Sequence, residues 1–384
     1  MTTEHYQHLG IFSDWAAKAA SESPLRPLAP PSAATYQRVR ETLGFCFKNE
    51  QPQEVHIDAE WERDGVAGQA ISWSVGYGPR SAAWLLKPAG ISEALPGVVA
   101  LHDHGGFKFF GKEKIAVGPE DPPDYINDYW FSYYGGRAYA NALALEGFAV
   151  LVPDTFLWGS RRFPQEVMDN GFAPVFDALS ADPLENGIPY EVAQYNFLAG
   201  LHEHEVEKYC HLLGTTLAGV VAYEDRVAVN YLLARPDVRP GGVGCVGLSG
   251  GGCRAGLLQA TCDDIKAAVV VGMMSTHEGL LDHNVRSHTW MFLPAGWSRF
   301  GDWPDLVACR APSPLLVQYD KEDDLFTMEG MHAADQRLAG HYAHVGHPDH
   351  YTGEFYPGPH KFDLDMQTSA FAWLKRHLAE PPQP

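Results

Sequence analysis

The sequence predicts an α/β protein built on a doubly wound, mostly parallel β-sheet. From Gly97 onward, short and nearly unbroken apolar segments alternate with segments of helical periodicity. Strands of a parallel sheet are covered on both faces, so they read as continuous apolar runs. A third observation is the glycine-rich stretch GLSGGG at 247–252, which joins one apolar run directly to a helical segment. This alternating order is typical of doubly wound sheets.

Composition excludes several classes of protein. The chain has 384 residues, 45% of them hydrophobic, and a net charge of −20 at pH 7. Nucleic acid is not an expected partner, because phosphate backbones need clustered Lys and Arg. No window approaches the roughly 18 apolar residues of a membrane span, and the first residues lack the basic and apolar regions of an export signal. We therefore expect a cytoplasmic location and no membrane association.

The six cysteines are sparse and form no CxxC pair. This spacing is typical neither of a disulfide framework nor of a zinc site.

The N-terminal third predicts an arm followed by an antiparallel sheet edge. Residues 1–50 are expected to form a helical arm or cap, with a helix around Trp15, a Pro-rich bend and a second short helix at 38–43. Two β-patterned runs, 55–62 and 71–86, follow on either side of an Arg-Asp-Gly turn. Alternating polar and apolar residues around such a turn predict an antiparallel pair at the edge of the sheet.

The remaining elements follow in alternation. Apolar runs predict parallel strands at 98–101, 148–153, 243–248, 265–274 and 315–319. A further short strand is expected at 351–355, before the last helix. Helical periodicity predicts the intervening helices, which are 136–146, 216–234, 253–260, 328–338 and 364–378.

Three long insertions interrupt this alternation, at about 107–134, 156–205 and 275–309. Long insertions at strand ends are typical of lids and binding loops, so residues 51–384 are predicted to be one catalytic domain that carries them. They are rich in aromatic side chains, and no phosphate-binding glycine motif accompanies them. We expect pocket walls and no cofactor. The candidate substrate-binding residues are His104, Phe107, Trp130, Trp158 and Trp290.

The stretch Gly247-Leu248-Ser249-Gly250-Gly251 matches the pattern G-x-S-x-G between a strand and a helix. In that context the serine sits on a strained turn at the carboxyl edge of the sheet, where flanking side chains would clash with the neighbouring strand and helix. Ser249 is therefore the predicted nucleophile. The alternative is a glycine-rich turn with an inert serine.

A serine nucleophile needs a base and a group that orients the base, and in this arrangement the chain order is serine, acid, histidine. His360 lies in the Gly/Pro loop before the last helix and is the predicted base. The loop after the strand at 315–319 holds Asp320, Asp323 and Asp324, each of which could be the orienting acid.

The reaction also needs two N–H donors for the developing oxyanion. One is expected from Gly250, the residue after the nucleophile. The second is expected from the His-Gly-Gly turn that follows the first parallel strand, with Gly106 as the predicted donor.

Four segments taken together resemble a known family: DHGGFKFFGKEK (103–114), GLSGGG (247–252), DDLF (323–326) and YPGPHKF (356–362). From about residue 50 onward the chain resembles the α/β-hydrolase superfamily, in its dienelactone-hydrolase-like and bacterial acetyl-xylan-esterase-like branch. The resemblance implies the α/β-hydrolase fold and hydrolysis of carboxylic esters through an acyl-serine, without a metal. The acid loop of such proteins commonly reads Asp-Pro-Leu-Phe, which implies Asp323 as the acid and places Asp324 where proline is usual.

These observations predict a serine ester hydrolase that acts on a small-molecule or oligosaccharide ester. Dienelactone is not an expected substrate, because true dienelactone hydrolases carry cysteine where this chain has Ser249. Amide, peptide or carbon–carbon bond hydrolysis on the same triad is one alternative. A non-catalytic binding module is another. The acyl group, the alcohol and the oligomeric state stay open, and a homo-oligomer is compatible with the sequence.

Further polar groupings have structural interpretations. Four histidines at 341, 344, 347 and 350 are interrupted by Gly346 and Pro348, so we expect a surface connection and no metal site. The run His-Glu-His-Glu at 202–205 could ligate a metal, but we expect it at a helix start, where its carboxylates complement the helix N-terminus. Arg161 follows the second parallel strand on the expected active-site edge, where it could recognise a substrate carboxylate. We expect instead a structural ion pair, with Asp154 or acids of the insertions as partner.

Overall fold

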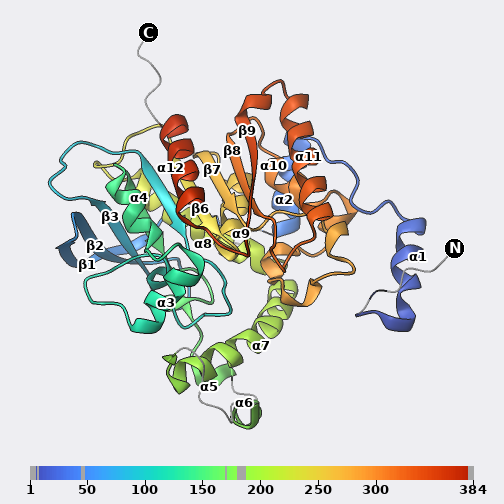
Figure 1. Ribbon diagram of the computed structural model, residues 1–384, viewed down its shortest axis with the longest axis horizontal. Helices are drawn as coiled ribbons and strands as arrows, with labels where there is room; N and C mark the ends of the chain where they lie inside the picture. Colours follow the sequence, from blue (N-terminus) through green and yellow to red (C-terminus); the bar gives the residue numbers. More distant parts are fainter. Residues whose placement is uncertain (1–5, 7, 45–47, 169–170, 180–186, 379–384) are drawn as a thin grey trace.

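The structure is a computed structural model that describes residues 6, 8–44, 48–168, 171–179 and 187–378. A nine-stranded sheet runs through its centre in the order β1-β2-β3-β5-β4-β6-β7-β8-β9 (Figure 1). The strands from β5 to β9 along this order are parallel, and β1, β2 and β3 join β5 as an antiparallel edge. The predicted doubly wound α/β sheet is therefore confirmed.

The antiparallel edge consists of β1 (Gln53–Arg63), β2 (Val66–Ser74) and β3 (Ser81–Pro88). Asp64 and Gly65, with φ of 50° and 77°, form the two-residue turn between β1 and β2. Two positive φ values are the requirement of a tight hairpin turn, which explains the Asp-Gly pair. The prediction of two strands is wrong in one respect: the run 71–86 breaks at 75–80, so the edge has three strands.

The remaining strands match the predicted apolar runs. They are β4 (Gly97–Leu101), β5 (Ala149–Pro153), β6 (Val243–Leu248), β7 (Ile265–Val271), β8 (Leu315–Asp320) and β9 (Tyr351–Tyr356). Alternate residues face opposite sides, so Val99 and Leu101 enter one core while Val98 and Ala100 enter the other. Burial on both faces is the reason these strands are apolar throughout.

Helices cover both faces of the sheet. One layer contains α2 (Ala33–Leu43), α8 (Leu217–Leu233), α9 (Gly250–Thr261), α10 (Trp303–Ala308) and α11 (Met328–His344). The opposite layer contains α3 (Asp124–Tyr133), α4 (Tyr139–Leu145) and α12 (Leu364–Leu378). Among the helices of the described residues, none combines the length and the apolar character that crossing a membrane requires.

The two N-terminal helices differ in their packing. Val39 and Leu43 of α2 are fully buried, and Arg40 donates a 3.1 Å hydrogen bond to the carbonyl of Thr261 at the end of α9. In contrast, α1 (Asp14–Glu22) buries none of its residues and lies at the side of the molecule (Figure 1). Thus α2 belongs to the helical layer, whereas α1 lies outside it.

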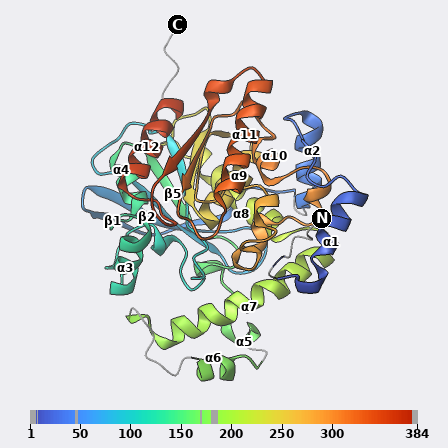
Figure 2. The ribbon, with the colours of Figure 1, turned by 45° about the vertical axis from the view of Figure 1, so that its right-hand side comes forward.

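The insertion that begins near residue 156 carries three helices, α5 (Gln165–Met168), α6 (Ala173–Leu179) and α7 (Tyr190–Leu212). They lie together at one end of the molecule, with α7 running across it (Figure 2). Residues 202–205 are in the middle of α7, so the prediction that they start a helix is wrong. Their carboxylates must therefore find partners other than a helix N-terminus.

Candidate active site

Ser249 occupies a strained turn between β6 and α9. Its backbone has φ of 57° and ψ of −122°, a conformation that L-residues rarely adopt, and its N–H donates to the carbonyl of Val271 at 2.8 Å. The flanking glycines are required by close approach. A Cβ on Gly247 would lie 2.5 Å from the carbonyl carbon of Gly251, and one on Gly251 would lie 2.2 Å from the carbonyl oxygen of Leu101. The glycine pattern is therefore a packing requirement.

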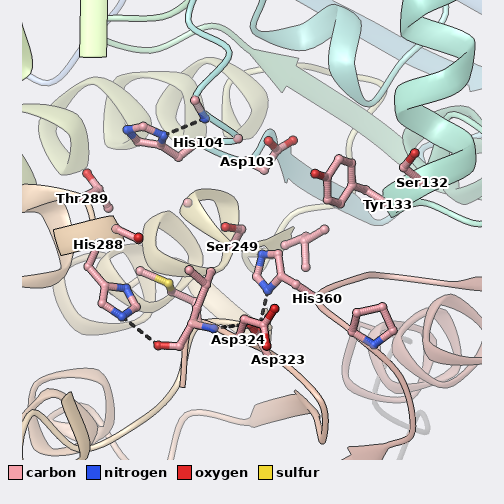
Figure 3. A pocket seen from close by; sticks show the side chains of 18 of the residues that line it. Asp103, His104, Ser132, Tyr133, Ser249, His288, Thr289, Asp323, Asp324 and His360 are labelled. Carbon is pink, nitrogen blue, oxygen red and sulfur yellow. Dashed lines mark hydrogen bonds and ion pairs between the residues drawn. The ribbon is translucent and has the colours of Figure 1, made fainter. Parts of the chain in front are cut away.

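His360 lies beside this turn and is bonded to Asp323. Its Nδ1 is 2.6 Å from Asp323 Oδ2, and the second carboxylate oxygen accepts the N–H of Leu325 at 2.9 Å. Figure 3 shows the imidazole between Ser249 and the carboxylate of Asp323. A Cβ on Gly272, the residue after Val271, would lie 3.0 Å from His360 Cε1, so the ring packs against the strand end that also holds Ser249.

The second nitrogen of His360, Nε2, is buried and makes no hydrogen bond within the described residues. Burial disfavours the protonated ring, but the hydrogen bond and charge of Asp323, with Asp320 and Asp103, outweigh it and raise the pKa of His360. A ring held by a carboxylate on one side, with its other nitrogen unused, is arranged to accept a proton.

The other two candidate acids of the loop, Asp320 and Asp324, do not bond to His360. Asp320 accepts the N–H of Lys361 at 3.0 Å, and its burial raises its pKa to about 7. The side chain of Asp324 is exposed, and its backbone carbonyl accepts hydrogen bonds from His283 and Asn284. Asp323 is thus the residue of the three that contacts the histidine.

A cavity of about 480 Å³ opens in front of Ser249. It is bounded by the loop after β4, helix α3, the insertion that begins at 275, the acid loop and the histidine loop. Its lining residues are Asp103, His104, Gly105, Gly106, Tyr129, Ser132, Tyr133, Leu248, Ser249, Gly250, Met273, Ser287, His288, Thr289, Asp323, Asp324, Leu325, Pro359 and His360.

The loop after β4 brings its backbone to the serine turn at His104. A Cβ on Gly250 would lie 2.5 Å from the backbone nitrogen of His104, so the two chain segments touch there. The N–H of His104 makes no hydrogen bond within the described part of the chain. The N–H of Gly106, in contrast, donates to His104 Nδ1 at 3.1 Å. The predicted oxyanion donor Gly106 therefore uses its N–H inside its own turn.

Glu203 of α7, whose carboxylate the sequence assigned to a helix N-terminus, is buried and holds this loop instead. It accepts hydrogen bonds from His104 Nε2 and Thr289 Oγ1, each at 2.9 Å, from the N–H of Trp290 at 3.3 Å and from Lys108. Burial by itself would raise the pKa of Glu203, but Lys108 and His104 hold it well below its ordinary value. Glu203 is therefore an ionised hub that joins three segments around the cavity.

Two further buried lysines fasten the same loop. Lys112 is 3.0 Å from Asp154, and Lys114 is 3.3 Å from Asp103, which also accepts the Tyr134 hydroxyl at 2.6 Å. The repeated lysines in an otherwise aromatic segment were the available sequence signal, because buried lysines require paired carboxylates.

Arg161 pairs with buried Glu224 at 2.5 Å. The expected structural ion pair is confirmed. Its partner is a residue of α8 instead of Asp154, because Asp154 is already paired with Lys112.

Most of the predicted substrate-binding aromatics lie outside the cavity lining. Phe107, Trp130 and Trp158 are buried, because their rings fill the space beneath the loops. Trp158 packs edge-on against His104, with ring centroids 5.1 Å apart, and Trp290 donates to His204 at 2.9 Å. Of the five predicted residues, His104 lines the cavity.

The four histidines at 341–350 do not converge on one point. His341 is buried and lies 2.6 Å from Asp305, whereas His347 and His350 lie near Asp349. In that second group His350 Nδ1 is already 2.6 Å from the carbonyl of Pro312.

Comparisons with known proteins agree with this architecture. No family model matches the chain. The protein named "Putative hydrolase YtaP" from Bacillus subtilis (strain 168) is 24% identical over 273 residues, which cover 71% of this chain and 75% of that protein.

Three solved structures share the arrangement. A protein described as a "putative acetyl xylan esterase" from Bacteroides fragilis NCTC 9343 has a TM-score of 0.64 at 16% identity, over 91% of this chain and 82% of its own. A promiscuous CE15 esterase from a marine bacterial metagenome has a TM-score of 0.60 at 15% identity, over 93% and 98%. A glucuronoyl esterase from Solibacter usitatus has a TM-score of 0.59 at 11% identity, over 90% and 91%. The chain therefore has the fold of these proteins, which is the predicted α/β-hydrolase fold.

Proposed function

We propose that this protein is a serine hydrolase of small or oligomeric carboxylic esters that works through an acyl-serine. The observation that carries the proposal is the 2.6 Å contact between Asp323 and His360 beside a strained serine turn, in one cavity. The hydrolase and esterase names of the proteins with similar sequence or fold support the same chemistry.

In the proposed reaction His360 Nε2 takes the proton of the Ser249 hydroxyl as its oxygen attacks the ester carbonyl. The tetrahedral intermediate collapses, and His360 passes that proton to the departing alcohol, which leaves an acyl-serine. Water, deprotonated by the same nitrogen, then releases the acid and restores Ser249. Asp323 holds the imidazole in the tautomer that presents an unprotonated Nε2.

For the oxyanion we propose the N–H groups of Gly250 and His104. Gly250 is the first residue of α9, whose leading N–H groups lack partners within the helix, and His104 is the loop residue that touches it. Because the N–H of Gly106 donates to His104 Nδ1, His104 replaces Gly106 in this role. The Gly106 bond and Glu203 then hold the ring on both sides and orient the His104 backbone.

A fluorophosphonate probe tests the proposal directly. We expect a covalent adduct on the peptide that contains Ser249, located by mass spectrometry, and loss of the adduct when a neutral ester competes. A matched pair of 4-nitrophenyl acetate and 4-nitroacetanilide should show hydrolysis of the ester far in excess of the anilide. A folded protein that forms no adduct at Ser249 would indicate a binding module, and faster anilide cleavage would indicate an amidase.

The pH dependence of kcat/KM should show one acidic limb, whose midpoint lies above the ordinary histidine pKa of about 6.5. Neutral His360 is the working form of the base, so kcat/KM falls as the pH decreases through the pKa of His360. Because this pKa is raised, the fall occurs above the ordinary histidine value. Asp320→Asn removes one of the charges that raise the pKa and should move the limb to lower pH. A limb at or below pH 6.5 in the unaltered protein would contradict this assignment.

A further inference from the structure

We infer that the cavity accepts neutral and cationic esters and discriminates against esters that carry a negative charge, with Asp324 as the specificity-determining residue. This inference rests on the proposed ester hydrolysis. Its basis is the charge of the cavity wall.

Among the described residues, no lysine or arginine lines the cavity, whereas three aspartates do. Two of these carboxylates have partners: Asp103 lies 3.3 Å from Lys114, and Asp323 lies 2.6 Å from His360. Asp324 has no ion pair among the described residues and is exposed. The wall therefore carries one carboxylate that no neighbouring cation offsets.

The histidines of the wall do not supply the missing positive charge. Burial lowers the pKa of His288 to about 4, so this ring is neutral near pH 7. His104 accepts the N–H of Gly106 at Nδ1 and donates from Nε2 to the Glu203 carboxylate, so both of its ring nitrogens already have partners. His360 must be neutral in order to act as a base. In the working enzyme, an anionic group on the substrate would meet no fixed cation in the wall.

The backbone of Asp324 is held by the insertion that begins at 275. Its carbonyl accepts hydrogen bonds from His283 at 2.9 Å and from Asn284 at 3.1 Å, both in the insertion that begins at 275. The nearest lysines along the chain are Lys321 and Lys361, and neither lines the cavity. Lys361 is paired with Asp363 at 2.6 Å. The Asp324 carboxylate is thus held at the cavity by its backbone.

The size of the effect follows from Coulomb's law. A carboxylate on the substrate about 6 Å from Asp324, in surroundings between water and protein interior, would lose about tenfold in kcat/KM. A cationic group at the same place would gain up to a similar factor. Added salt would shrink both differences, because the carboxylate is exposed to solvent.

Three matched 4-nitrophenyl esters test the inference: methyl 4-nitrophenyl glutarate (neutral), 4-nitrophenyl hydrogen glutarate (anionic) and 4-nitrophenyl 4-(trimethylammonio)butanoate (cationic). At low ionic strength we expect kcat/KM to decrease from the cationic to the neutral to the anionic ester. The neutral ester should exceed the anionic one by about tenfold.

Variants then locate the cause. Asp324→Asn should reduce the ratio of neutral to anionic turnover to about two or less, and Asp324→Lys should invert it. Glu329→Gln is the matched control, since Glu329 is an exposed carboxylate close by in the sequence that does not line the cavity, and it should leave the ratio unchanged. Thermal unfolding of each variant verifies that the fold is retained.

The outcomes separate the two proposals. If Ser249-dependent hydrolysis of the neutral ester occurs but the ratio is near one, or does not respond to either Asp324 variant, the charge selection is wrong while the ester hydrolase stands. If no ester is hydrolysed in a Ser249-dependent manner, both are wrong.

Discussion

Ser249→Ala is expected to reduce kcat for 4-nitrophenyl acetate by a factor on the order of 10⁶, because the alanine has no oxygen to form the acyl intermediate. The fold should survive, since the hydroxyl makes no hydrogen bond within the described residues and the strain of the turn lies in its backbone. Initial rates at saturating ester, with circular dichroism of the purified variant, measure both quantities.

Ser287→Ala provides a matched control for that substitution. Ser287 lines the same cavity but has no bond to His360 or Asp323 in the described structure. Its loss should keep kcat within about tenfold of the unaltered protein, as expected for a wall residue without a part in the chemistry. Equal losses in the two variants would show that the cavity, and not the Ser249 nucleophile, is being disturbed.

Asp323→Asn is expected to reduce kcat by about 10⁴-fold with little change in structure. The carboxylate now accepts from His360 Nδ1, which leaves Nε2 unprotonated toward the cavity. An asparagine amide can donate to Nδ1 instead, and the proton then resides on Nε2, where it blocks base catalysis. The acidic limb of kcat/KM should also move to lower pH, because the charge that raises the His360 pKa is removed.

The neighbouring carboxylate Asp320 serves as the control for this variant. Asp320→Asn should cost less than tenfold in kcat, because Asp320 bonds to the N–H of Lys361 and not to the imidazole. If Asp320→Asn abolished turnover while Asp323→Asn retained it, the orienting role would belong to Asp320. Measurement of both variants on the same ester decides between them.

Helix α7 shows why part of the fold escaped prediction. Its buried positions Val192, Tyr195, Ala199, Glu203 and Val206 follow a helical spacing, but the stripe includes an acid. A glutamate within an apolar stripe predicts a solvent-exposed position unless a buried cationic partner is known. For Glu203 that partner is Lys108, which lies 95 residues away in the sequence. The sequence therefore predicted an insertion to about residue 205 and a helix start at 202–205, whereas the helix of 23 residues already begins at Tyr190.

The candidate site divides in the same way. The serine turn could be predicted from the sequence because a strained strand-to-helix turn needs glycines at fixed offsets from the serine, and this requirement is local. The proposed second oxyanion donor, His104, could not be predicted, because the choice depends on which N–H remains unused after the loop has formed its own bonds. The N–H of Gly106 donates to His104 Nδ1. The backbone N–H of His104 became a candidate only through its packing against Gly250, which the sequence does not show.

The sequence by itself determined the order of strands β4 to β9 and of the helices α4, α8, α9, α11 and α12 that alternate with them. It also named Ser249, the acid loop and His360 as segments that meet at one sheet edge. Strand identity follows from two-sided burial and the turn from backbone sterics, and both are written in neighbouring residues. The tertiary structure alone decided which aspartate contacts the histidine, which aromatic rings are core, and that Glu203 anchors the cavity wall. Those choices depend on the directions of side chains brought together from distant segments, and no local pattern encodes them.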